Sequence, residues 1–209
     1  MEGLLCNYLK ERVLIVKNHA HENTGFNSRI LNEIDRQFEF AERTKDDVLF
    51  VRYDIQFPDG AAPKNDEKVN AAYRVFQIKF MKNLSRKGLS PQYVAVREES
   101  ADEQAHYHVA LMLDGRKAQT AQDHIQTAER LWESTLGLPA LENGYGLIRN
   151  CTTDRNGKML PDGVLLRKGD SDAEQKKKDC ARQANQLAKN EDKGMTPKWQ
   201  RELFSSRLP

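Results

Sequence analysis

The hydrophobic positions of the chain fall into short apolar runs and longer periodic segments, which predict alternating strands and helices. Residues 48–57 form a strongly apolar run that predicts a strand, closed by a Pro-Asp-Gly turn at residues 58–60. Residues 92–97 and 106–113 predict two further strands, which a short polar turn joins into an antiparallel hairpin. Residues 145–150 predict a fourth strand.

The segments between these strands carry apolar residues at helical spacing. One predicted helix places an apolar stripe on a single face, formed by Val69, Ala72, Tyr73, Phe76, Phe80 and Leu84. A second helix is predicted to begin at Thr120, because Thr120 and Asp123 resemble a capping box. A last long helix is predicted to begin at Ser171, where Ser171 and Glu174 match the same pattern, and to end before Gly194.

Residues 1–45 are charged and helix-prone, with a polar break at residues 18–28. His19 and His21 lie in this break, and without a strand to align them we expect solvated side chains. We therefore predict an N-terminal helical segment, residues 1–45, followed by a domain over residues 46–209.

The order strand, helix, strand, strand, helix, strand is the split pattern of ferredoxin-like folds. We expect an α+β fold, in which a central antiparallel sheet carries helices on one face. In such a fold the first and third strands are neighbours. Asp54 on the first strand would then face His106 and His108 on the third.

Composition limits the function classes. Charged residues make up 31% and hydrophobic residues 38% of the 209 residues, with no long apolar stretch, so we expect no membrane span. No cationic segment followed by an apolar one marks a secretory signal at the start. The dispersed Cys6, Cys151 and Cys180 form neither a disulfide framework nor a zinc cluster, which is typical of a cytoplasmic protein.

Positive charge is concentrated late in the chain. Residues 149–209 hold 14 Lys and Arg against 9 Asp and Glu, a net charge of +5, whereas the remainder has a net charge of −3. A basic C-terminal part suits a polyanionic partner such as nucleic acid. A solvated helix face, with Lys176, Lys177 and Lys178, would give a similar bias.

The strongest chemical signal is the segment His106-Tyr107-His108 at the start of a predicted strand. Side chains alternate along a strand, so the two histidines share one face and lie close enough to bind one metal ion. The acidic pair Glu98 and Glu99 ends the preceding strand of the hairpin. Two histidines and one carboxylate form an open site for a catalytic divalent ion.

Alternation allows only one of the two glutamates, Glu98 or Glu99, on the metal face. Asp54 is a candidate supporting or alternative ligand, although a strand-end aspartate bonded to a turn explains it equally well. Arg52 and Arg97 are candidate phosphate contacts, and ion pairs with neighbouring acids are the alternative.

Several of these segments resemble the YagK/YfjJ family, the inovirus gene-2-type replication proteins, which is similar to the HUH endonucleases of rolling-circle replication. The resemblance extends over residues 46–209 and includes 51–54, 93–98, 106–111, 187–189 and 205–207. It implies a ferredoxin-like palm and a Mg²⁺ or Mn²⁺ ion held by the two histidines and a third ligand. Glu98 is preferred over Glu99 as this ligand, because it matches the Arg-Glu end of the family strand. It further implies that a helix-borne tyrosine attacks a DNA phosphodiester and becomes linked to the 5′ phosphate.

The resemblance extends to candidate DNA contacts and partners. Lys189 would lie near the scissile phosphate, and Arg52, Arg97 and Arg207 would contact DNA. The implied function is single-stranded DNA nicking and replication initiation for a phage or mobile element. The expected partners are single-stranded or hairpin DNA at a replication origin and, in addition, the host replication machinery, with no membrane.

The chain departs from the family at the nucleophile. Gln186 stands where the family tyrosine is expected, and an amide is not a nucleophile toward phosphate. Three explanations remain open: a metal-activated water replaces the tyrosine, the protein is a catalytically silent DNA-binding or decoy derivative, or the nucleophile has moved to Tyr145 or Tyr107. Leu187 is predicted to point into the core, so Gln186, turned about 100° from it, should project toward the histidines.

Overall fold

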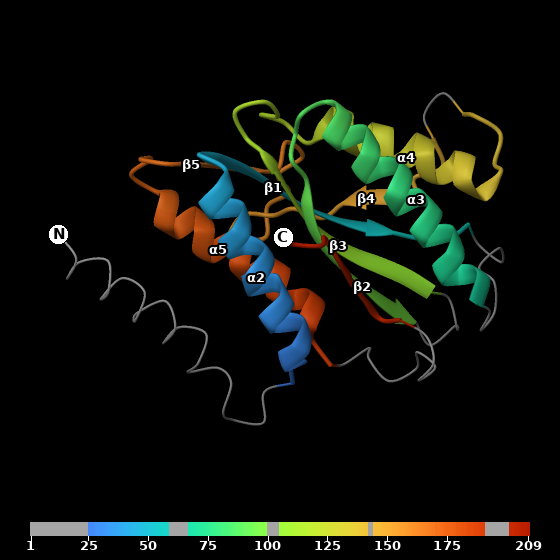
Figure 1. The fold of residues 1–209 in the computed structure, drawn as a ribbon, viewed down its shortest axis with the longest axis horizontal. Helices are drawn as coiled ribbons and strands as arrows, with labels where there is room; N and C mark the ends of the chain where they lie inside the picture. The colour runs from blue at the N-terminus through green and yellow to red at the C-terminus, as the bar shows by residue number, and fades with distance from the viewer. Residues whose placement is uncertain (1–24, 59–66, 100–104, 142–143, 191–200) are drawn as a thin grey trace.

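A computed structural model describes residues 25–58, 67–99, 105–141, 144–190 and 201–209 (Figure 1). The elements follow in the order α2 (Ser28–Thr44), β1 (Asp47–Ile55), α3 (Glu67–Arg86), β2 (Gln92–Glu99), β3 (Ala105–Asp114), α4 (Gln122–Leu136), β4 (Ile148–Asn150), β5 (Val164–Arg167), α5 (Ala173–Asn185), the 3₁₀ turn η1 (Gln186–Ala188) and β6 (Leu203–Ser205).

The strands form one antiparallel sheet in the order β4-β1-β3-β2-β6, and β5 pairs with the first half of β1. The predicted strands at 48–57, 92–97 and 106–113 are therefore confirmed as β1, β2 and β3. The predicted pairing of the first and third strands is also confirmed, because Asp54 lies directly opposite His108. The predicted α+β class with a central antiparallel sheet is correct.

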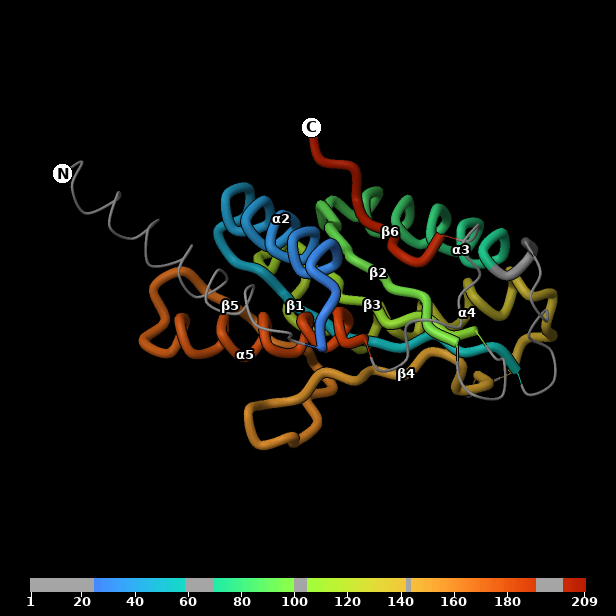
Figure 2. The backbone as a smooth tube through the Cα atoms, turned by 90° about the horizontal axis from the view of Figure 1, so that it is seen from below, coloured from blue at the N-terminus to red at the C-terminus, as the bar shows by residue number. Residues whose placement is uncertain are grey.

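Helices cover both faces of this sheet, whereas the sequence predicted helices on one face. One face packs against α3 and α4, and the other packs against α2, α5 and η1. Figure 1 shows α2 and α5 side by side at one end of the sheet and α3 and α4 at the other, and Figure 2 shows the strands from a second side. The reason lies in the central strands, where residues 48–51 and 109–113 are apolar at both odd and even positions, so both faces require cover.

The helix α2 confirms the helical character predicted before residue 45. Its buried residues Ile30, Ile34 and Phe38 belong to the same core as β1 and β2, so the predicted boundary between residues 45 and 46 falls inside one packed unit. Asn27 caps the helix, since its side-chain oxygen accepts hydrogen bonds from the backbone of Arg29 and Ile30. His19 and His21 lie outside the described residues.

Both predicted capping boxes are wrong. The N-cap of α4 is Ala121 and that of α5 is Asp172, and neither side chain makes a capping hydrogen bond. The last helix ends at Asn185 and continues as η1, so it stops well before Gly194, which lies outside the described residues. Among the helices that the structure describes, none has the length and apolar character of a membrane span.

Candidate metal centre

Strand alternation and register bring three potential ligands together on the face that α2 and α5 cover. Along β3, His106 and His108 lie on the same side as Ala110. In β2, Glu98 is on the same side as Val96 and pairs directly with His106. The carboxylate and both imidazoles therefore meet where β2 ends and β3 begins.

The distances suit one shared cation. The Oε2 atom of Glu98 lies 3.0 Å from Nε2 of His108 and 3.8 Å from Nε2 of His106. One ligand atom from each of the three residues lies within 4.8 Å of the others. Two imidazole nitrogens and one carboxylate oxygen are donors that Mn²⁺ and related divalent ions accept. The residues therefore fit a catalytic metal with open coordination positions.

Asp54 supports this cluster from the neighbouring strand. Its Oδ1 atom lies 2.6 Å from Nδ1 of His108, the ring nitrogen that does not face Glu98. Such a carboxylate fixes the tautomer and orientation of a metal-binding imidazole. Asp54 is itself held by the thiol of Cys151, which donates to Oδ2 at 3.2 Å, and by Arg52, whose Nη2 lies 3.8 Å from Oδ1.

The two carboxylates change the proton affinity of His108. Burial lowers the pKa of the imidazole, but the hydrogen bonds and charges of Asp54 and Glu98 outweigh burial and raise this pKa to about 9. Burial raises the pKa of Asp54, but the bond to His108 and the nearby positive charges hold it below its usual value. Burial and the charge of Asp54 raise the pKa of the Cys151 thiol to about 12, so the thiol is protonated and donates.

The second acidic residue of the pair points away from this cluster. Glu99 lies on the opposite face of the sheet, where its Oε2 atom pairs with Nη2 of Arg97 at 3.3 Å. Arg97 is 1% exposed, so the predicted DNA contact at Arg97 is wrong. The alternative, an ion pair with a neighbouring acid, is what the structure shows. Glu98 occupies the metal face, so alternation turns Arg97 to the opposite face.

The other two arginines predicted to contact DNA differ in whether they lie at the metal cluster. Arg52 shares its face and contacts Asp54. Arg207 is exposed and follows Ser206, whose backbone bonds to Tyr93 at the far end of β2 from Glu98. The structure does not bring Arg207 to the metal cluster.

The family tyrosine position lies on η1. Leu187 and Ala188 are buried against the metal face of the sheet, as predicted for Leu187. Gln186 is half-buried, and its amide Nε2 donates to the carbonyl of Arg182 at 3.5 Å. Lys189 follows Ala188 and forms a β-bridge with Phe26, which lies just before α2. The projection of Gln186 toward the histidines stays a prediction.

Tyrosines in the described residues do not supply the missing phenol at the cluster. The strand residues Tyr53, Tyr93 and Tyr107 all alternate to the opposite face. Tyr73 is buried in the hydrophobic core on that opposite face, where it stacks on Tyr107 with ring centroids 4.0 Å apart. The backbone of Tyr145 donates to Glu133 on α4, which also covers that opposite face.

The sequence analysis missed Arg149 as a functional candidate. Arg149 on β4 is exposed and pairs in register with Asp54, so the backbone order across the sheet is Arg149, Asp54, His108 and then Val96. The sequence pattern at residues 148–150 does not indicate which strand pairs with this short segment. Only the register in the folded sheet shows that Arg149 flanks the cluster.

The comparisons with known proteins agree with the resemblance in the sequence. The family model for the YagK/YfjJ C-terminal domain matches residues 9–202. The chain belongs to this family. The match includes α2 and most of the segment before it, beyond the range 46–209 that the resemblance covered.

Individual proteins add little to this assignment. No curated protein matches this YagK/YfjJ family member. The catalytic domain of the adeno-associated virus type 5 Rep protein is a similar solved structure, with 9% sequence identity and a TM-score of 0.38. The match covers 65% of this chain and 97% of that chain. Similarity at this level is too low to infer a shared function or mechanism.

Proposed function

We propose that this protein is a divalent-metal-dependent DNA-processing protein of the HUH type. It nicks single-stranded or hairpin DNA in the replication of a phage or mobile element. The observation that carries this proposal is the cluster of Glu98, His106 and His108, with Asp54 behind His108. Membership of the YagK/YfjJ family supports it.

Each residue of the cluster has a defined role in this proposal. Glu98, His106 and His108 would hold Mg²⁺ or Mn²⁺, which when bound would neutralise charge on a non-bridging phosphate oxygen. Asp54 orients His108 with Nε2 toward Glu98, because it occupies Nδ1. Arg52 and Arg149 flank Asp54 and bind adjacent phosphates, and Lys189 is the proposed contact near the scissile phosphate.

Water replaces the phenol as the attacking group. The described tyrosines lie on or against the other face, and Gln186 occupies the family position. In this step a water oxygen bonds to phosphorus, the bond from phosphorus to the 3′ oxygen breaks, and the 3′ oxygen is protonated. The products are a 5′ phosphate and a 3′ hydroxyl with no covalent protein adduct.

A catalytically silent DNA-binding derivative is the second candidate function. Gln186 favours it, because the metal cluster is intact while the residue that the family uses as nucleophile is changed. Such a protein would recognise an origin, or block a related replication protein there.

One experiment tests the proposal and separates the two candidates. The protein is incubated with Mn²⁺ and a library of single-stranded oligonucleotides, and cut ends are identified by sequencing. Recurrent cut sites that disappear in His106→Ala/His108→Ala support nicking. Binding without cuts, under conditions where a tyrosine-bearing relative cleaves, supports the silent derivative. Cuts that persist in the double variant contradict the proposed metal centre.

A further inference from the structure

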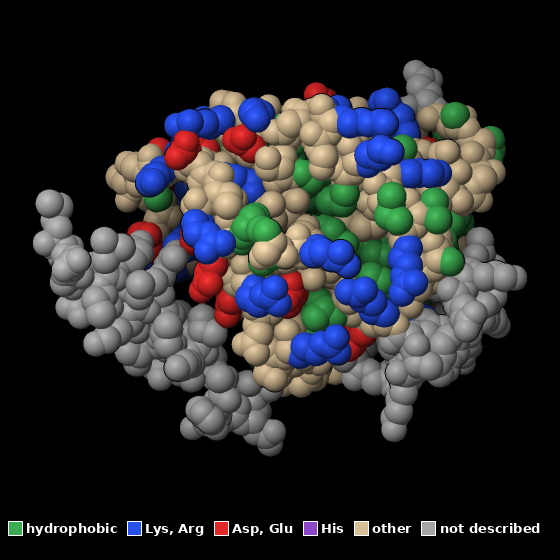
Figure 3. Space-filling view, viewed as in Figure 1, with side chains coloured by type: hydrophobic (Ala, Val, Ile, Leu, Met, Phe, Trp, Pro, Cys, Tyr) green, Lys and Arg blue, Asp and Glu red, His purple; other side chains and the backbone are tan. Residues whose placement is uncertain are grey.

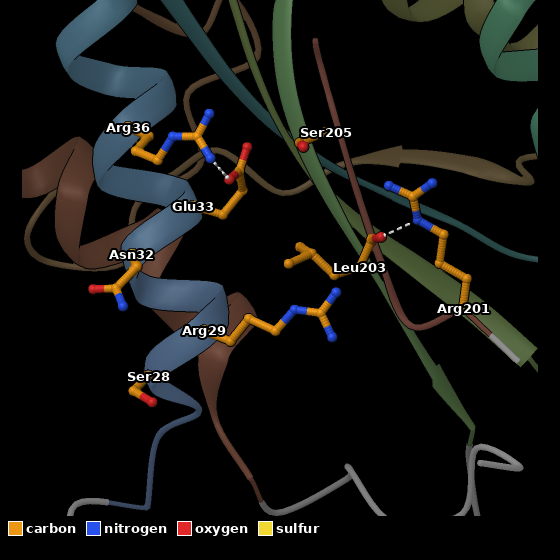
Figure 4. Close-up of a pocket in the computed structure, with 8 residues that line it drawn as sticks. All are labelled: Ser28, Arg29, Asn32, Glu33, Arg36, Arg201, Leu203 and Ser205. Carbon is orange, nitrogen blue, oxygen red and sulfur yellow. Dashed lines mark hydrogen bonds and ion pairs between the residues drawn. The ribbon is translucent and has the colours of Figure 1, made fainter. Parts of the chain in front are cut away.

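A groove between α2 and β6 lies near the metal cluster and shares no residue with it. Its cavity has a volume of about 530 Å³. The side chains that line it include Arg29, Asn32 and Arg36 of α2, with Arg201, Leu203 and Ser205 in or next to β6. Figure 4 shows Arg29 on the α2 wall and Arg201 on the β6 wall, with Leu203 between them.

The groove is basic. Three arginines and one glutamate line it, for a net charge of +2, and the glutamate, Glu33, is bound to Arg36 at 3.1 Å. Within the described part of the chain, no carboxylate forms an ion pair with Arg29 or Arg201. Figure 3 shows Lys and Arg side chains gathered on this side of the molecule. Two guanidinium groups that line one groove repel each other, and an anion bound in the groove would offset this repulsion.

Arg201 is held in place before any ligand binds. Its Nε atom donates to the carbonyl of Leu203 at 2.6 Å, and its guanidinium lies over the Phe204 ring, 5.1 Å from the centroid. Figure 4 shows its terminal nitrogens directed away from that bond. Because the side chain is ordered by the protein, binding an anion costs little further conformational entropy.

Strand register and a backbone hydrogen bond connect the groove to the elements around the metal cluster. Leu203 pairs with Val96, which pairs with His108, so the groove lies two strand positions from the cluster, about 10 Å at the usual strand spacing. At its other wall, the backbone of Asn27 bonds to Ala188 of η1 at 2.7 Å, immediately before the groove residues Ser28 and Arg29.

We propose that this groove binds the sugar–phosphate backbone of the single-stranded DNA on one side of the scissile phosphate. The bound DNA then runs across the sheet from the groove, over Glu98 and His108, to Arg149 on the far side. Phosphate diesters are recognised by arginine forks and by the hydroxyl and amide groups that line the cavity. This inference rests on the proposed function, since it gives the groove the same substrate as the metal cluster.

The test uses the full chain and a fluorescent single-stranded oligonucleotide, with Mn²⁺ present. Arg29→Ala/Arg201→Ala removes one guanidinium group from each wall of the groove. The matched control, Arg86→Ala/Arg130→Ala, removes two exposed arginines from α3 and α4, which cover the opposite face. We expect the groove variant to lose about tenfold or more in affinity near 0.1 M salt. The slope of log affinity against log salt should become shallower by about 1.4, or ~0.7 per lost phosphate contact.

Separate readouts distinguish the failure of this inference from the failure of the proposed function. Mn²⁺ binding, followed by calorimetry, should be the same in wild type and groove variant. If the groove variant does not fold, Arg29→Glu takes its place, with Arg130→Glu as its control, because Arg29 is exposed and near a helix N-terminus that tolerates a carboxylate.

Equal affinity of groove and control variants for DNA overturns the groove assignment and leaves the function standing. A wild-type protein that binds Mn²⁺ but no single-stranded DNA overturns both. Tighter binding of RNA than of DNA with the same sequence overturns DNA as the occupant of the groove.

Discussion

The Nδ1 atom of His108 lies 2.6 Å from Oδ1 of Asp54, a residue 54 positions earlier in the chain on the neighbouring strand. On its other side, Nε2 of the same ring lies 3.0 Å from Glu98. One imidazole thus joins two carboxylates from β1 and β2. In the proposed metal centre, this arrangement suits Glu98 as a ligand and Asp54 as an orienting group.

The first prediction concerns the metal itself. Titration with Mn²⁺ by calorimetry should show one site per chain, and His106→Ala/His108→Ala should abolish it, because two of the three donors are lost. His124→Ala is a suitable control, since His124 lies on α4, which packs on the opposite face. Undiminished binding in the double variant would place the metal elsewhere.

The second prediction concerns Asp54. Asp54→Asn should weaken Mn²⁺ binding by roughly 10- to 100-fold without abolishing it, because His108 loses its orienting carboxylate but stays a donor. Asp123→Asn, in the first turn of α4, removes a carboxylate far from the cluster and should have no effect. A complete loss of binding in Asp54→Asn would instead make Asp54 a direct ligand.

The third prediction is a pH dependence of metal binding. His108 must lose its proton to bind a metal, and its pKa is raised to about 9. Mn²⁺ affinity should therefore rise with pH, by up to about tenfold per pH unit, and level off near pH 9. Calorimetry in buffers of different ionisation enthalpy should show one proton released per ion at pH 7. Binding without proton release would contradict the raised pKa.

The same group makes the metal-free protein less stable in alkali. The pKa of His108 is raised from 6.5 to about 9, so its contribution is fully present below pH 6.5 and is lost as pH rises through 9. In the presence of a chelator, the free energy of unfolding should fall by roughly 1–3 kcal/mol across this window relative to His108→Asn. Asp54, whose pKa is lowered, acts at the other end, where its contribution is lost in acid.

The fourth prediction concerns Gln186. Gln186→Tyr should leave a covalent protein–DNA adduct on a denaturing gel, because it restores a phenol at the family position near the metal face. Gln175→Tyr, an exposed position on the preceding helix α5, is the control and should give none. An adduct already formed by the wild type would contradict attack by water and direct attention to Tyr145.

The fifth prediction separates Glu98 from Glu99. Glu99→Ala should lower the free energy of unfolding by about 3 kcal/mol, because it leaves the buried Arg97 without its partner. Mn²⁺ binding should be unchanged, since Glu99 is on the opposite face. Arg97→Met/Glu99→Leu should recover most of the lost stability in urea denaturation. Loss of Mn²⁺ binding in Glu99→Ala would show that Glu99 is the ligand.

Local periodicity was enough to predict the elements that build the centre. Alternation along residues 106–108 placed both histidines on one face and Tyr107 on the other, because a pleated strand turns each successive side chain by half a turn. The short turn between the hairpin strands placed a carboxylate beside the two imidazoles. Neither inference needs any residue from outside the hairpin.

The wrong predictions are of two kinds. Some depend on competition between residues close in the chain, and others depend on contacts from distant residues. Thr120 and Ser171 match a capping pattern, but α4 and α5 begin at later residues, since tertiary packing outweighs a cap worth about 1 kcal/mol. Arg97 was named as a candidate phosphate contact, although alternation puts it on the face opposite Glu98.

Long-range geometry accounts for the rest of the site. Arg149 pairs with Asp54 through the register of β4, Cys151 contacts Asp54 from the loop after β4, and Arg201 lines one groove with Arg29 because β6 returns to the edge of the sheet. The two residues of each pair are separated by more than ninety positions, so no periodicity in the chain encodes their proximity. Their positions follow from the pairing of whole strands and the burial of both sheet faces, which are properties of the folded chain as a unit.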